Sequence, residues 1–355
     1  MTTVGVIGGG QLGRMLALAG VPLGVTCVVV EPSADAPAAA VADVIQAPFD
    51  DERAWAELAR RCDVVTVELE HVPIDALAWL AERVPVRPPP AAVQAAQDRR
   101  AEKEAFAAAG IATARWAHPA ATFAAGTVVK RRFGGYDGRG QVVLGRGVPV
   151  DGTLDGDCIS EELVPFDREL SIVAARGVDG TVACYPVVEN RHYQGMLRTT
   201  LAPAPALTPS LQSRAASIAV ALAESLDYVG VLAVELFDVG GTLLANEMAP
   251  RVHNSGHWTI EGAATSQFEQ HLRAVCGWPL GSTEHRPTAM VNLIGAPPDV
   301  EAVLAVPGAH LHLYGKTPRP GRKLGHITLR TPTWEVLHER LAQAREVLNS
   351  PPELG

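Results

Sequence analysis

Short apolar runs alternate with helix-forming stretches through the first ninety residues of the chain. The apolar runs have the length and the β-branched content of buried parallel strands, and helix-forming segments follow them. The predicted strands are residues 4–7, 25–30 and 63–68, and the predicted helices are residues 14–19 and 74–83. This alternation is typical of an α/β unit with a parallel sheet. Pro88-Pro89-Pro90 marks the clearest boundary in the chain, so residues 1–90 are predicted to form the first domain.

The middle of the chain contains longer elements with clear ends. Asp98 can cap a helix that runs to Ala109 and stops at Gly110. An amphipathic helix is predicted at residues 215–226 and a further helix at residues 266–276, ending at Gly277, and strand patterns surround them. From residue 288 onward the pattern turns β-rich again, with turns rich in Gly and Pro. The fold class predicted from these patterns is α/β, with an α+β character overall.

One hairpin places two glutamates near each other. Residues 229–237 and 243–251 read as strands joined at Gly240-Gly241. A two-residue loop would place Glu235 opposite Asn246, whereas a three-residue loop would place Glu235 opposite Glu247. Facing carboxylates repel unless a cation lies between them, and Mg²⁺ with nucleotide phosphates would fit there. The alternative is that only one of the two glutamates faces a site.

The composition limits the class of protein. The 355 residues are 47% hydrophobic and 19% charged, which suits globular folding in two or three structural units. The net charge of −9 disfavours binding to nucleic acid or to an anionic membrane, so any anion site must be locally basic. The five cysteines are dispersed without pairing motifs, no secretory signal pattern opens the sequence, and the apolar run at residues 15–30 is too short for a membrane span. We therefore expect a soluble protein of the cytoplasm.

Two glycine-rich stretches are candidates for anion binding. Gly8-x-Gly10-x-x-Gly13 lies between a predicted strand and helix, with Glu31 after the next strand, as in dinucleotide-binding folds; a tight turn without a dinucleotide is the alternative. The second stretch, residues 128–141, sends three consecutive cations into a loop with four glycines in seven residues. Such a loop can hold phosphate on its backbone amides and cations, although many loops of this kind are only flexible and basic.

Polar residues also end the predicted strand 63–68. Glu68, Glu70 and His71 lie at its carboxyl end, the edge where parallel sheets bind ligands. They are candidates for binding a polar substrate, and a solvated strand end is the alternative.

Several motifs together resemble one family. Lys130 to Gln141, with its Gly-Gly-Tyr-Asp-Gly-Arg-Gly-Gln run, and the donor-rich Arg-x-His-Asn-Ser-Gly-His segment at residues 251–257 are similar to those of the N5-carboxyaminoimidazole ribonucleotide synthetases, which are ATP-grasp ligases. The resemblance covers nearly the whole chain. It implies an ATP-grasp fold with a Rossmann-like pre-ATP-grasp domain at 1–90, an ATP-grasp domain at 91–280 with a mobile lid at about 112–180, and a small β-rich C-terminal domain at 281–355.

The resemblance also implies a reaction. ATP, 5-aminoimidazole ribonucleotide and bicarbonate would give N5-carboxyaminoimidazole ribonucleotide, ADP and phosphate in purine biosynthesis, with Mg²⁺ as cofactor and a homodimer as the assembly. Whether the amine attacks carboxyphosphate or released CO₂ stays open. The alternatives are another ATP-grasp ligase, such as a formate-dependent glycinamide ribonucleotide transformylase, or a nicotinamide-dependent oxidoreductase that uses the Gly8 to Gly13 turn.

The resemblance also implies roles for individual residues, which are assigned here by their positions in the matching motifs. Those expected to bind the nucleotide are Arg99, Lys130, Gly135, Tyr136, Asp137, Gly138, Arg139, Gly140, Gln141, Glu161, Glu162, Leu163, Val164, Glu169, His192, Asn246 and Glu247. Glu235 and Glu247 are expected to hold Mg²⁺. The residues expected around the reacting atoms are Arg251, His253, Asn254, Tyr136, Asp137 and Arg139, and those expected to bind the ribonucleotide are Glu70, Lys316, Arg322 and Lys323.

Overall fold

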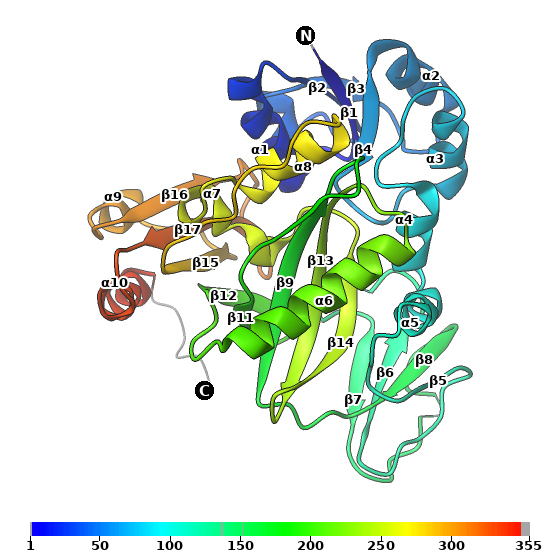
Figure 1. Cartoon of the computed structure of the whole chain (residues 1–355), viewed down its shortest axis with the longest axis vertical. Helices are drawn as coiled ribbons and strands as arrows, with labels where there is room; N and C mark the ends of the chain where they lie inside the picture. Colours follow the sequence, from blue (N-terminus) through cyan, green and yellow to red (C-terminus); the bar gives the residue numbers. More distant parts are fainter. Residues whose placement is uncertain (1, 136–137, 151, 349–355) are drawn as a thin grey trace.

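The computed structural model describes residues 2–135, 138–150 and 152–348, and it contains three sheets (Figure 1). Tyr136 and Asp137, both predicted site residues, lie outside the described residues. No helix in the described part of the chain is long and apolar enough to cross a membrane.

The first sheet is parallel, with the order β3-β2-β1-β4. Its strands are β1 (Thr3–Ile7), β2 (Thr26–Glu31), β3 (Asp43–Gln46) and β4 (Val64–Val67). Helix α1 (Gln11–Gly20) packs on one face, and α2 (Glu52–Arg61) and α3 (Ile74–Ala81) cover the other. Because successive residues of a strand point to opposite faces, Val6 packs toward α1 while Ile7 packs toward α2 and α3. The predicted α/β unit is confirmed. Two short 3₁₀ helices, η1 (Val21–Leu23) and η2 (Pro37–Ala40), complete it.

Two helices lead from this unit to a small antiparallel sheet, β5-β8-β6-β7, which forms the lower right of Figure 1. The helices are α4 (Pro90–Gln97) and α5 (Arg99–Ala108), and the strands are β5 (Trp116–Ala117), β6 (Thr127–Arg131), β7 (Gln141–Leu144) and β8 (Cys158–Glu162). Asp98 caps α5 through the amide of Arg100, and Gly110 follows the helix with positive φ, as the sequence predicts. The glycine-rich stretch joins β6 to β7, with Lys130 paired to Gln141.

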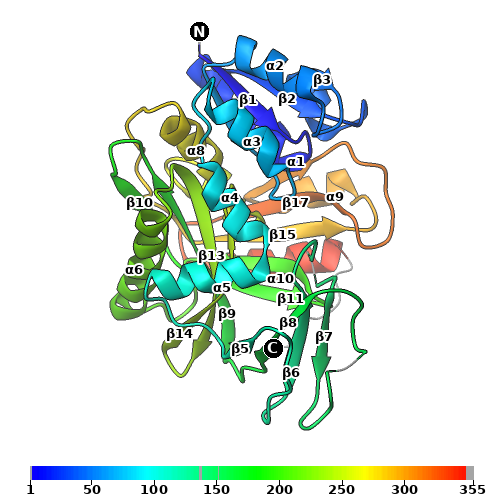
Figure 2. The ribbon, with the colours of Figure 1, turned by 90° about the vertical axis from the view of Figure 1, so that its right-hand side faces the viewer.

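The third sheet has nine strands and runs through the centre of the molecule (Figure 2). Its order is β14-β13-β9-β11-β12-β15-β17-β16, and β10 pairs with β9. The strands are β9 (Arg168–Arg176), β10 (Val182–Cys184), β11 (Val188–Tyr193), β12 (Met196–Ala202), β13 (Gly230–Val239), β14 (Thr242–Ala249), β15 (Thr288–Ile294), β16 (Ala309–Leu313) and β17 (Lys323–Arg330). The C-terminal strands therefore continue the central sheet through the β12–β15 pair.

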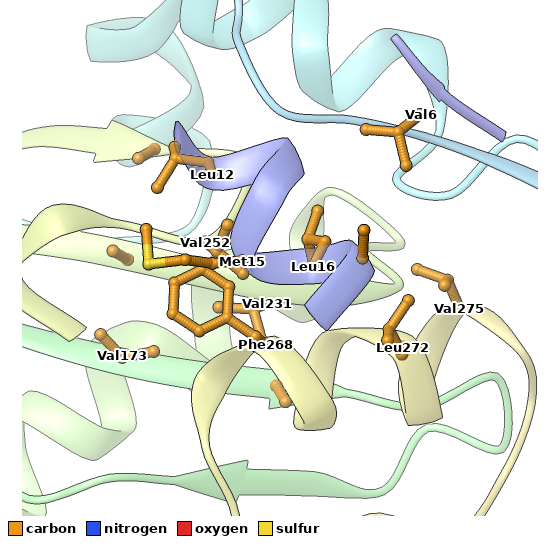
Figure 3. Close-up of a cluster of buried hydrophobic side chains, with 14 of the residues drawn as sticks. Val6, Leu12, Met15, Leu16, Val173, Val231, Val252, Phe268, Leu272 and Val275 are labelled. Atoms are coloured by element: carbon orange, nitrogen blue, oxygen red, sulfur yellow. The ribbon is translucent and has the colours of Figure 1, made fainter. Parts of the chain in front are cut away.

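Helices cover both faces of the central sheet. They are α6 (Pro209–Ser225), α7 (Thr259–Gly262), α8 (Gln267–Val275), α9 (Val300–Leu304) and α10 (Trp334–Val347), with the 3₁₀ helix η3 (Asn254–Gly256). Figure 3 shows the core between α1, α8 and the sheet, where Met15 and Leu16 meet Val231 and Phe268. On the opposite face, Leu232 and Val234 pack against α6. The first unit is thereby fixed against the central sheet by one shared core.

Candidate active site

A cavity of about 590 Å³ lies where the three sheets meet. Most of the predicted site residues that the structure describes line it. These are Glu70, Arg99, Lys130, Gly135, Gly138, Arg139, Gln141, Glu161, Glu162, Leu163, Val164, Glu169, His192, Glu235, Asn246, Glu247, Arg251, His253, Asn254 and Lys323. Of the predicted residues that are described, Gly140, Lys316 and Arg322 do not line it. Lys316 is nevertheless close, because its Nζ donates to Oε1 of Gln11, a lining residue.

The glycine turn of the first unit holds one of the protein's own carboxylates. The amides of Gly10 and Gly13 donate to the two oxygens of Glu68 at 2.8 and 2.9 Å. A Cβ on Gly13 would stand 2.7 Å from the backbone carbonyl oxygen of Gly8, so this position requires glycine. Burial raises the pKa of Glu68, against the two backbone hydrogen bonds, which lower it. The amides that would bind a dinucleotide pyrophosphate are thus already satisfied by Glu68.

A buried chain of charges forms the floor of the cavity. Both Glu161 oxygens are engaged, one by Lys130 at 2.9 Å and the other by Lys103 at 3.0 Å. Burial would raise the pKa of Glu161, but the two lysines outweigh burial and lower it to about 2. The Lys130 ammonium also donates to Oδ1 of Asn246 at 3.0 Å. Glu161 therefore fixes Lys130 with its charge directed into the cavity.

The adjoining wall of the cavity combines apolar side chains with the backbone at the end of β8. Glu162, Leu163 and Val164 follow one another along the end of β8, and Phe166 stacks on Phe237 with ring centroids 4.7 Å apart. A flat apolar wall beside backbone groups can hold a purine base. Next to it, the imidazole of His192 lies 3.1 Å from a carboxylate oxygen of Glu169. Burial lowers the pKa of His192, but the hydrogen bond to Glu169 and the charges of the nearby carboxylates together outweigh burial and raise it.

The sequence left open whether the hairpin loop has two or three residues, and therefore which residue faces Glu235. The turn is the two-residue Gly240-Gly241 loop, since Val239 pairs with Thr242. A β-bulge between Leu236 and Glu235 then shifts the register by one residue, so that Glu235 faces Glu247 rather than Asn246. Both glutamates line the cavity. The shorter loop is therefore correct, and the bulge produces the pairing expected from the longer one.

The two facing carboxylates have opposite electrostatic surroundings. Burial and the charge of Glu247 raise the pKa of Glu235. For Glu247 burial acts in the same direction, but Arg99 and Lys130 outweigh it and lower the pKa. Arg99 binds Glu247 directly, with NH1 2.5 Å from Oε2. Glu235 lies 3.5 Å from Nε2 of His253, and the more distant charges of His192 and Lys323 lower its pKa less than burial and Glu247 raise it.

A cation would balance this pair, although the described residues contain no cluster of three His, Cys, Asp or Glu side chains that could hold a metal alone. Two carboxylates with an amide oxygen beside them suit Mg²⁺ when phosphate oxygens supply the remaining ligands. The residues therefore fit a nucleotide-dependent magnesium site.

The far end of the cavity gathers donors from the segment after β14. Arg251 binds Glu70 with NH2 2.5 Å from Oε1. Nδ1 of His253 accepts from the amide of Ser255 at 3.3 Å and lies 2.9 Å from its hydroxyl. Burial, reinforced by Arg251, lowers the pKa of His253 to about 3. The ring is therefore neutral at pH 7, with Nε2–H facing Glu235 and the cavity.

Sequence reasoning gave no role to several residues that support this site. Glu102 and Lys103 are buried although they carry charge, with Glu102 at the cavity wall, and Phe166 and Phe237 form the stacked wall. The helix spacing of Arg99, Glu102, Lys103 and Phe106 places them on one face, which is a signal that the sequence contains. The aromatic stack carries no such signal because its two rings come from segments far apart in the chain.

Three protein-family models match successive parts of the chain, and related proteins match nearly all of it. The ATP-grasp domain model matches residues 94–268, the ribonucleotide synthetase preATP-grasp domain matches 1–97, and the phosphoribosylaminoimidazole carboxylase C-terminal domain matches 288–340. The N5-carboxyaminoimidazole ribonucleotide synthase of Pseudomonas aeruginosa is 46% identical over 361 residues, covering 98% of this chain and 99% of that protein. The Brucella melitensis enzyme of the same name is 47% identical, covering 92% of this chain and 96% of that protein.

Solved structures of this kind of enzyme resemble the chain in both fold and sequence. The N5-carboxyaminoimidazole ribonucleotide synthetase of Thermus thermophilus superposes with a TM-score of 0.92 at 47% identity, covering 98% of this chain and 99% of that one. The Aspergillus clavatus enzyme, solved in complex with ADP and 5-aminoimidazole ribonucleotide, has a TM-score of 0.88 at 30% identity, with 99% of each chain covered.

Proposed function

The chain belongs to the N5-carboxyaminoimidazole ribonucleotide synthase family of ATP-grasp enzymes, and from this premise we infer that it is an ATP-dependent C–N ligase of purine biosynthesis. It carboxylates 5-aminoimidazole ribonucleotide, and ATP is converted to ADP and phosphate. Bicarbonate is the proposed source of the carboxyl group.

One observation carries the residue assignment. A single cavity holds the buried Lys103–Glu161–Lys130 chain, the facing Glu235 and Glu247, and the Arg251–His253 end. These three groups suit the three requirements of the reaction: a cation for the ATP phosphates, carboxylates for a divalent ion, and donors for the oxygens of bicarbonate.

We assign the nucleotide to the side of the cavity built from β8 and β13. The base would lie along Glu162 to Val164 with the Phe166–Phe237 stack beside it, and Glu169 with His192 would address the ribose. Lys130 would contact the phosphates. Since both oxygens of Glu161 already face lysines, its proposed role is to position Lys130, with contact to the nucleotide made through that lysine.

Glu235 and Glu247, with Asn246 beside them, would hold Mg²⁺. When bound, the ion would offset charge that builds up on the phosphoryl oxygens. In its absence Arg99 neutralises Glu247, and Glu235 is left with the raised pKa of a carboxyl facing a like charge. Phosphate and metal therefore complete a charge balance that this part of the site lacks on its own.

At the far end, Arg251 and the Nε2–H of His253 would donate to bicarbonate and to the carboxyphosphate formed from it. A bicarbonate oxygen accepts the γ-phosphoryl group and ADP leaves. The amine of the ribonucleotide then attacks the carbon of carboxyphosphate, or of the CO₂ that forms when phosphate departs first, and the amine loses a proton; in both routes phosphate is released. Because His253 is neutral and its Nδ1 is occupied by Ser255, it acts here as a hydrogen-bond donor.

The ribonucleotide phosphate needs cations in an otherwise acidic protein. Lys323 lines the cavity, Lys316 reaches Gln11 at its margin, and Arg322 lies on the same turn with NH1 donating to the Thr317 carbonyl. Burial lowers the pKa of Lys316 to about 8, so a bound phosphate would restore its full charge. We propose that these three residues, with Arg139, bind the 5′-phosphate, and that the assembly is a homodimer, which light scattering at micromolar concentration would measure.

The component dependence of ADP release tests this function. With purified chain and MgATP, ADP release should require both bicarbonate and 5-aminoimidazole ribonucleotide. Replacing them with formate and glycinamide ribonucleotide should give only the background rate, because the nearest alternative in this fold is the formate-dependent transformylase. ADP release that follows formate instead would contradict the proposal.

A further inference from the structure

The bulge in β14 makes two consecutive side chains face the cavity. In a regular strand, neighbours alternate between faces, and Ala245 and Met248 belong to the buried core cluster beside α4 and α5, with Met248 also reaching the cavity wall. Between them, Asn246 and Glu247 both line the cavity, with Asn246 contacting Lys130 and Glu247 contacting Arg99. Without the bulge, the two-residue turn would pair Glu235 with Asn246 and Val234 with Glu247. Glu247 would then turn toward the core, and the carboxylate pair would be lost.

The bulge lies on an edge strand of the central sheet. Among the described residues, β14 pairs in this sheet only with β13, and its outer side has one isolated bridge, between Ala245 and Thr113. A bulge leaves backbone groups unpaired, and burying such groups without partners is unfavourable. The bulge therefore needs partners from outside the sheet.

Two adjacent residues of α5 supply those partners. Nζ of Lys103 donates to the carbonyl of Asn246 at 2.7 Å, and Oε1 of Glu102 accepts from the amide of Met248 at 2.6 Å. The two contacts stand on either side of Glu247. Both side chains are buried, with 0% of the Lys103 side chain and 3% of the Glu102 side chain exposed. Lys103 also holds Glu161, so the same ammonium joins the bulge to the residue that fixes Lys130.

We propose that Glu102 and Lys103 are positioning residues that hold the β14 bulge, and thereby place Glu247 opposite Glu235 for the divalent ion that the nucleotide brings. The inference rests on the proposed magnesium site, and neither residue needs to touch nucleotide, metal or substrate. A purely structural role would affect folding alone; a positioning role affects the response of nucleotide binding to Mg²⁺.

The readout is the ratio of ADP dissociation constants measured without and with Mg²⁺, by calorimetry on the full chain. The test variant is Lys103→Met, which removes the ammonium donor and keeps a long, unbranched side chain. Its matched control is Arg100→Met on the same helix, where Arg100 is exposed and paired with Glu104. We expect the ratio to fall at least about 10-fold in Lys103→Met and to stay unchanged in the control. Turnover in Lys103→Met should drop on the order of 100-fold, since misplacement by about 1 Å has that effect.

A pair of variants at Glu102 keeps the proposal testable if Lys103→Met does not fold. Glu102→Gln retains an oxygen that can accept from the Met248 amide and should keep the Mg²⁺ response, whereas Glu102→Leu should lose it. A folded Lys103→Met or Glu102→Leu chain with the wild-type ratio would overturn the proposal. If the wild-type chain itself shows no Mg²⁺ response, the metal assignment is wrong, and the inference falls with it.

Discussion

Replacing Glu235 by Gln should make the protein more stable and nearly inactive. The side chain is 15% exposed and faces Glu247 across the bulge. Burial and that neighbouring charge raise its pKa from 4.5 to about 8. Glutamine keeps the shape but removes the repulsion, so it improves the ligand-free fold while it removes a carboxylate that the reaction needs. Only a residue retained for function behaves in this way.

The magnitude follows from the pKa. One pKa unit corresponds to about 1.36 kcal/mol, so the shift of Glu235 sets a ceiling of about 4–5 kcal/mol on the destabilisation. Relaxation and water in the cavity reduce such penalties, and we expect on the order of 2 kcal/mol. Because the folded-state pKa is raised, the penalty is absent below the unfolded pKa of 4.5, grows as pH rises toward 8, and is complete above that value.

The assay compares thermal unfolding of wild type and Glu235→Gln at pH 4.5 and pH 8.5, without nucleotide or metal. The variant should unfold a few degrees higher at pH 8.5, with no gain at pH 4.5. Its kcat should fall about 10²–10³-fold at saturating Mg²⁺. Glu104→Gln, an exposed carboxylate on α5, is the control and should change neither quantity. A lower unfolding temperature at pH 8.5, or an unchanged kcat, would refute the reasoning.

Three further outcomes are expected. Glu247→Gln should abolish turnover in a folded chain, because it removes a proposed metal ligand and the partner of Arg99; near-normal kcat at saturating Mg²⁺ would count against the metal assignment. Arg322→Ala should raise KM for the ribonucleotide about 10–100-fold, from the loss of a charge-assisted hydrogen bond, and leave KM for ATP unchanged; loss of ATP affinity instead would reverse the two anion sites. NADH should not bind at micromolar concentration, because Glu68 occupies the Gly10 and Gly13 amides, and calorimetric titration would detect such binding.

Local patterns predicted the elements well where one residue decides an element boundary. Asp98 and Gly110 bound α5 because a cap and a positive φ are short-range requirements, and Ser266 caps α8 in the same way. The glycine turn at residues 8–13 was also found from spacing. The sequence did not predict that Glu68 binds the amides of this turn. Glu68 follows another strand, β4, and reaches the turn only when β1 and β4 pair.

The carboxylate pair shows why loop length alone was insufficient. Turn chemistry allowed two loops, and each fixed a different partner for Glu235. The bulge that decides the pairing is held by Glu102 and Lys103, which lie more than a hundred residues earlier in the sequence. The helix spacing of Glu102 and Lys103 with Arg99 can be read from the sequence, but only the tertiary fold shows that Glu102 and Lys103 are buried and contact an irregular strand.

The fate of a labelled carboxyl group tests the central claim most directly. With ¹³C-bicarbonate, ATP, Mg²⁺ and 5-aminoimidazole ribonucleotide, carbon NMR should show one new carbamate carbon on the ribonucleotide for each ADP formed. The signal should disappear when ATP is omitted, because bicarbonate is a poor electrophile until it is phosphorylated. If ADP accumulates without any labelled ribonucleotide, or if labelled formate enters glycinamide ribonucleotide instead, the chain does not catalyse the carboxylation assigned to it.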